Sequence, residues 1–66
     1  MKIVVQNRKT NAFLTQDAKW VRRLDDARQF RTSIEALRFC ADRELRETDM
    51  LVCFPGQRAN LRLPLI

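Results

Sequence analysis

The chain has 66 residues, of which 13 are Lys or Arg and 8 are Asp or Glu, giving a formal net charge of +5. At this length folding removes only about 60% of the surface that the unfolded chain exposes, so we expect a single domain spanning residues 1–66 with marginal stability as a monomer. The sequence contains no His and one Gly, which excludes a histidine-based catalytic triad, an imidazole metal ligand, a P-loop and a Rossmann fingerprint.

The N-terminal residues predict a β-hairpin. The β-branched run 3–6 is typical of a short strand, and the polar segment 7–11 contains two Asn suited to a turn. Residues 12–15 (Ala-Phe-Leu-Thr) then predict the returning strand.

A third short strand and a turn follow the hairpin. Trp20 and Val21 predict a brief extended segment, and the adjacent residues Asp25 and Asp26 predict a turn. Residues 27–31 alternate with period 2, and Phe30 is the residue expected to point inward.

The clearest predicted element is a helix over residues 33–46. Thr32 and Glu35 have the spacing of a capping box, with Thr32 as the N-cap. One face carries the apolar residues that we expect to pack on the sheet, namely Ile34, Leu37, Ala41 and Leu45, with Ala36 and Cys40 at its edge. The opposite face carries i,i+4 pairs of opposite charge, and Phe39 falls in its middle.

Two further strands complete the predicted sheet. Residues 50–54 are uniformly apolar, and 55–57 predict a turn. Residues 58–63 alternate strictly between polar and apolar residues, and Pro64 then ends the ladder or lies on an edge strand. The order ββ(β)αββ predicts an α+β fold, in which a small antiparallel sheet of four to five strands carries one helix on one face.

Several of these strands are apolar on both faces, which suggests that the sheet needs a second covering layer. We expect symmetric self-association, because a closed homodimer is the commonest oligomer and a small chain gains most from one. The alternative is that the tail 63–66 covers this face. Phe39 on the charged helix face is either a further interface residue or covered by Trp20 or the chain end. The residues predicted at the interface are Val4, Phe39, Leu51 and Cys53.

The cysteines predict neither a metal site nor catalysis. Cys40 and Cys53 do not form a CxxC pair, and we expect two buried, reduced thiols, with a disulfide as the alternative. Two sulfurs without imidazole cannot complete a structural zinc site within one chain, so we expect no metal and no cofactor. No apolar run reaches the roughly 18 residues of a membrane span, and the N-terminus lacks a signal-peptide core, so a cytoplasmic location is expected.

The positive charge is concentrated away from the predicted helix. Residues 1–23 hold six basic groups against one acid, whereas residues 24–54 hold five basic and seven acidic groups. We therefore do not expect the helix to act as a recognition helix in a DNA groove. A basic sheet surface could instead bind nucleic acid weakly and electrostatically. The candidate residues for this function are Arg8, Lys9, Lys19, Arg22, Arg23, Arg58 and Arg62. The simpler interpretation is that these charges solubilise the sheet edges.

Catalysis is not expected. Asp25 and Asp26 are explained by turn formation, and Asp17 has no histidine to work with. The function predicted first is therefore a non-enzymatic interaction module that associates with itself, and nucleic-acid binding is the alternative.

The central part of the chain resembles a family pattern. After the hairpin come Trp20 and then Ala27-x-x-Phe30-x-x-Ser33-x-Glu35-Ala36-x-x-Phe39, which resembles a pattern in small bacterial and phage-borne domains without an established activity. The resemblance implies close helix–sheet contacts at Ala27, Phe30 and Ala36, and it assigns no functional residue.

Overall fold

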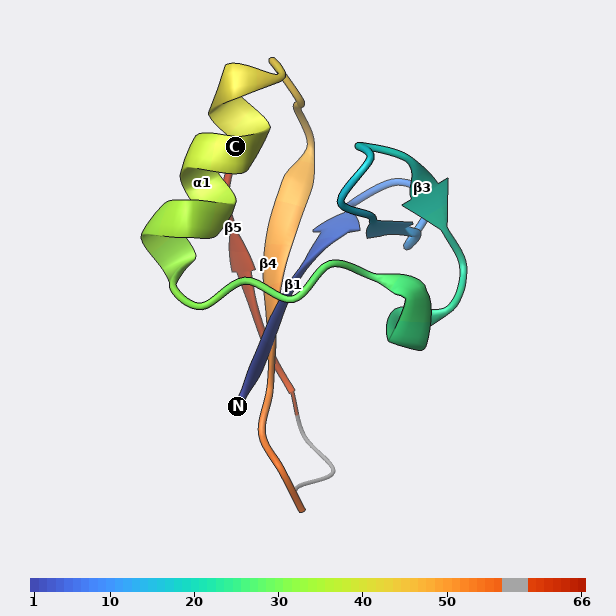
Figure 1. Ribbon diagram of the computed structural model, residues 1–66, viewed down its shortest axis with the longest axis vertical. Helices are drawn as coiled ribbons and strands as arrows, with labels where there is room; N and C mark the ends of the chain where they lie inside the picture. Colours follow the sequence, from blue (N-terminus) through green and yellow to red (C-terminus); the bar gives the residue numbers. More distant parts are fainter. Residues whose placement is uncertain (57–59) are drawn as a thin grey trace.

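In the computed structural model, which describes residues 1–56 and 60–66, one helix packs on one face of a five-stranded antiparallel sheet (Figure 1). The strands are β1 (Lys2–Asn7), β2 (Phe13–Leu14), β3 (Trp20–Val21), β4 (Thr48–Cys53) and β5 (Leu61–Pro64), and their order in the sheet is β3-β2-β1-β4-β5. The helix is α1 (Ser33–Asp42), preceded by a 3-10 turn at Leu24–Asp26. The predicted α+β class is thus confirmed. No helix among the described residues is long and apolar enough to cross a membrane.

The pairing of β1 with β4 divides the sheet into two sides. Ile3 lies opposite Val52 and Val5 opposite Met50, and all four belong to the core beneath α1. The remaining core residues are Leu14, Phe30, Ala36, Phe39 and Cys40. The alternate residues of each strand point to the other face. We call the face that carries the core the helix side and the other face the open side.

The helix buries a different face from the one predicted. Ala36, Phe39 and Cys40 are buried, whereas the side chains predicted to be buried at Ile34 and Leu37 are 60% and 41% exposed. Of the two alternatives for Phe39, an interface residue or a covered ring, the structure shows a covered ring, because only 7% of this residue is accessible. Ile34, Leu37 and Ala41 of the predicted apolar face are exposed, whereas Leu45 packs against the core.

The position of Phe39 explains why the helix is turned this way. Its ring packs edge-on against the ring of Phe30, with the centroids 5.4 Å apart. The guanidinium carbons of Arg28 and Arg43 lie 4.7 Å and 3.7 Å from the centroid of the Phe39 ring. Planar guanidinium groups stack favourably on aromatic faces, so one arginine before the helix and one at its C-cap cover this ring.

The N-terminus of α1 uses the predicted cap. The hydroxyl of Thr32 accepts a hydrogen bond from the backbone N–H of Glu35, at 3.1 Å. The Glu35 carboxylate does not return a hydrogen bond to the backbone N–H of Thr32, which a full capping box would require. Instead it accepts a hydrogen bond from Arg28, at 3.0 Å, which ties the helix start to the segment before it.

The helix ends earlier than predicted. Glu44 adopts a positive φ of 54°, its N–H donates to the carbonyl of Ala41, and the N–H of Leu45 donates to the carbonyl of Cys40. This pair of bonds is a Schellman motif, and Leu45 packs against the core after it. The left-handed residue stops the helix at Asp42.

Other sequence-based predictions can be compared directly. Phe30 is buried and bridges to Ile3 as expected of an inward residue. Of the three residues implied to make close helix–sheet contacts, Phe30 and Ala36 are buried, and Ala27 is half-buried. The part of the predicted turn and last strand at residues 57–59, which includes Arg58, lies outside the described residues.

Candidate functional site

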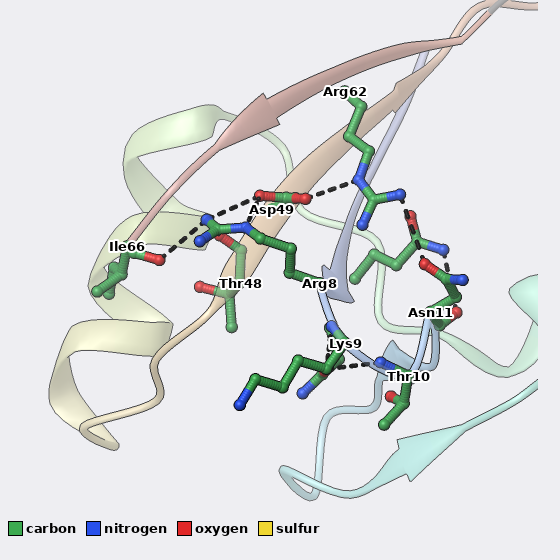
Figure 2. A network of polar contacts seen from close by, with 10 residues as sticks. Arg8, Lys9, Thr10, Asn11, Thr48, Asp49, Arg62 and Ile66 are labelled. Atoms are coloured by element: carbon green, nitrogen blue, oxygen red, sulfur yellow. Dashed lines mark hydrogen bonds and ion pairs between the residues drawn. The ribbon is translucent and has the colours of Figure 1, made fainter.

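A buried carboxylate organises the polar contacts on the open side. Asp49 lies in β4, and its side chain is only 8% exposed. Its Oδ1 accepts hydrogen bonds from Nε and Nη2 of Arg8 at 3.1 and 3.0 Å, and its Oδ2 accepts one from Nε of Arg62 at 2.6 Å. Figure 2 shows the two guanidinium groups reaching the carboxylate from opposite sides. One carboxylate therefore orients two arginines from distant parts of the chain.

The two arginines also set the protonation of Asp49. Burial by itself raises the pKa of this carboxyl, but the hydrogen bonds and positive charges of Arg62 and Arg8 outweigh burial, and the pKa is lowered from its ordinary value of 3.8. Asp49 is consequently ionised at neutral pH, as required for it to hold both guanidinium groups.

Further contacts restrain the two arginines. Nη2 of Arg8 also donates to the carbonyl oxygens of Thr48 at 3.4 Å and of Ile66 at 3.2 Å. Nη1 of Arg62 lies 3.5 Å from Oδ1 of Asn11. The site therefore joins β4 and β5 to the turn between β1 and β2.

That turn is built by side chain-to-backbone bonds. Oδ1 of Asn7 accepts hydrogen bonds from the backbone N–H groups of Lys9 and Thr10, at 2.8 and 3.0 Å. Asn11 has a φ of 63°, a conformation that Asn tolerates better than most residues. The ammonium group of Lys9 pairs with Glu47 at 3.2 Å, with both side chains well exposed.

The structure brings together some of the predicted basic residues and not others. Arg8 and Arg62 meet at Asp49, and Arg22 lines a shallow hollow with residues 10–12 of the same turn. Lys9 lies on the same turn and forms an ion pair with Glu47. Lys19, between β2 and β3, and Arg23, just after β3, have no ion-pair partner among the described residues. The position of Arg58 is not among those described.

The predicted interface residues offer little exposed apolar surface. Val4 is fully buried and Phe39 nearly so, while Leu51 and Cys53 are half-buried. Val4, Leu51 and Cys53 share the open side of the sheet with the polar residues Lys2, Gln6, Asp49 and Arg62. The exposed large apolar residues on structured elements are instead Trp20, Ile34, Leu37, Leu61 and Leu63.

The two cysteines occupy different environments. Cys40 lies on the buried face of α1, as predicted, and burial raises the pKa of its thiol. Cys53 is half-buried on the open side. Both are free thiols in the structure.

Sequence reasoning overlooked Asp49 as an organising residue. Asp49 stands immediately before the apolar run 50–54. An acidic residue at the start of a buried strand could have indicated an ion pair, because buried charges are rarely unpaired. Its two partners lie 41 and 13 residues away, and no local pattern identifies them.

No protein-family model, curated protein or solved structure matches this chain.

Proposed function

We propose that the chain is a cytoplasmic, non-enzymatic interaction module that binds a second copy of itself through the free edge of β5. The observation that carries this proposal is the exposure of apolar side chains there: Leu61 is 48% and Leu63 38% exposed. Ile34 and Leu37, at 60% and 41% exposure, add apolar area on the outer face of α1. A 66-residue chain has a small core of its own, and self-association would add buried apolar area to it.

The backbone of β5 supports an antiparallel contact. The strand is last in the sheet order, so one of its edges has no neighbour among the described residues. The N–H of Leu65 donates to Thr48 of β4, and backbone groups alternate in direction along a strand. Leu61 and Leu63 therefore direct their backbone groups toward β4, and Arg62 directs its N–H and C=O outward.

A two-fold axis at Arg62 would use these outward groups. The N–H and C=O of Arg62 would then pair reciprocally with those of the partner's Arg62. In the same register Leu61 would lie opposite the partner's Leu63 on the helix side, where close cross-strand apolar pairs stabilise a sheet. Pro64 has no N–H to donate, which limits this ladder to a short segment.

The charge of Arg62 does not prevent this arrangement. Its side chain lies on the open side, opposite Leu51 of β4, and is held by Asp49 of its own chain at 2.6 Å. The guanidinium of Arg62 would thus keep its carboxylate partner within its own protomer, and the apolar pairs would form on the other side of the joined sheet.

Sedimentation equilibrium over a range of protein concentrations tests this proposal. We expect a reversible monomer–dimer equilibrium, weakened at least about tenfold (about 1.4 kcal/mol) in the double variant Leu61→Lys/Leu63→Lys. The matched control is Trp20→Lys, an exposed aromatic-to-charge change on β3 at the opposite edge, which should leave the equilibrium unchanged. Circular dichroism verifies that each variant is folded.

Hydrogen exchange provides a second readout. The amide of Arg62 should become protected as protein concentration rises, while the amide of Leu65, bonded to Thr48 within the chain, should not change. A chain that remains monomeric at millimolar concentration overturns self-association. A dimer that Trp20→Lys disrupts and the leucine double variant leaves intact overturns the assignment to β5.

A further inference from the structure

A second surface, distinct from the β5 edge, concentrates positive charge. Lys2 points to the open side of the sheet, because it lies opposite Cys53 in the register that places Val4 opposite Leu51. Arg8 and Arg62 reach the same side, since both bind Asp49. Arg22 follows β3 and lines a hollow with residues 10–12, whose Asn11 side chain contacts Arg62. We call the three open-side cations Lys2, Arg8 and Arg62, together with the neighbouring Arg22, the basic face.

Two carboxylates lie near the basic face, and both are engaged. Glu47 pairs with Lys9 of the neighbouring turn at 3.2 Å, and the nearly buried Asp49 holds Arg8 and Arg62. The carboxylates of α1 belong to the layer on the other side of the sheet. Because Asp49 is buried beneath two partly exposed arginines, an anion that approaches the open side meets their guanidinium groups before this carboxylate.

Asp49 leaves both guanidinium groups able to bind an anion. Arg8 uses Nε and Nη2 for its described contacts, and Arg62 uses Nε and Nη1. Nη1 of Arg8 and Nη2 of Arg62 have no acceptor within the described ranges, and the two side chains are 45% and 40% exposed. Because their orientation is already restrained, less side-chain entropy is lost when they bind a phosphate oxygen.

An aromatic side chain lies on the same face. Phe13 of β2 is opposite Gln6 of β1, and Gln6 is opposite Asp49 of β4, so the three share the open side. Phe13 is half-buried and next to residues 10–12 of the hollow. Basic groups along a strand surface with an aromatic ring among them are the composition of single-strand binding platforms, where bases stack and phosphates pair with cations.

We infer that the basic face binds single-stranded nucleic acid, with Arg8, Arg22, Arg62 and Lys2 contacting phosphates and Phe13 stacking on a base. The helix α1, which carries Glu35 and Asp42, lies on the other side of the sheet from the basic face. The inference does not depend on self-association, because the β5 contact uses backbone groups and the helix side of the strand.

Fluorescence anisotropy with a labelled oligothymidylate at two salt concentrations tests this inference. The variant Lys2→Ala/Arg22→Ala removes two proposed phosphate contacts and leaves the Asp49 pairs intact. We expect weaker binding and a slope of log K against log salt that is shallower by about 1.4, at roughly 0.7 per single-strand phosphate contact. The matched control, Arg31→Ala/Arg38→Ala, removes two exposed arginines outside the basic face and should leave the slope unchanged.

A separate variant tests the proposed stacking of Phe13 on a base. Phe13→Leu keeps an apolar side chain but removes the stacking surface, and we expect about tenfold weaker binding with an unchanged salt slope. Three results would overturn the inference: no binding at low salt, an equal loss in the arginine control pair, or tighter binding of a duplex than of the single strand. Binding retained by Leu61→Lys/Leu63→Lys in a monomeric state would separate this surface from the one proposed for self-association.

Discussion

The ring of Phe39 packs edge-on against the ring of Phe30, with centroids 5.4 Å apart and planes inclined by 66°. This contact determines which face of α1 is buried. It places Phe39 in the core although its helical neighbours are charged, and it leaves Ile34 exposed although its spacing is that of a core residue.

The first prediction compares these two helical positions. Phe39→Leu should lower the free energy of unfolding by about 1–2 kcal/mol, because a smaller side chain loses the aromatic contact and its packing. Ile34→Ala should change it by no more than about 0.5 kcal/mol, since this side chain is 60% exposed. Urea denaturation at low protein concentration measures the free energy of unfolding of both variants. A larger loss for Ile34→Ala than for Phe39→Leu would show that the face containing Ile34 packs on the sheet.

The second prediction concerns Asp49 and pH. Asp49→Asn should cost about 1–3 kcal/mol near pH 7, because two guanidinium groups lose a charged acceptor. The folded-state pKa of Asp49 lies below its ordinary value of 3.8, so its contribution is present above that value and is lost as pH falls through the folded pKa.

The difference in stability between the native chain and Asp49→Asn should therefore shrink as pH is lowered below about 4. Urea denaturation at a series of pH values measures this difference. Asp17→Asn, at an exposed position, serves as the control and should show no such convergence. A difference for Asp49→Asn that is independent of pH would contradict the proposed charge pairing.

The third prediction concerns the end of α1. Glu44 occupies the left-handed position of the Schellman motif with a φ of 54°, where a side chain is strained and Gly is not. Glu44→Gly should raise the free energy of unfolding by about 1 kcal/mol. Thermal unfolding of Glu44→Gly and Glu44→Ala separates the backbone effect from loss of charge, because Ala retains the strain. Equal stability of the two variants would show that φ is not the cause.

Much of the fold could be predicted from local patterns. The N-cap at Thr32, the strand at Trp20–Val21 and the inward position of Phe30 follow from short-range spacing. The candidate sites could be predicted only in part. Arg8 and Arg62 were recognisable as basic candidates, but their meeting at Asp49 depends on the β1–β4 and β4–β5 pairings.

Length, charge and the alternation of apolar residues are enough to identify a small, basic α+β domain, because these are local properties of the chain. Which helix face is buried depends on packing between elements. Two apolar faces compete for the sheet, and aromatic packing with Phe30 and two stacked arginines favours the one that contains Phe39. The tertiary structure likewise brings Arg8 and Arg62, which are far apart in the chain, to a single buried carboxylate.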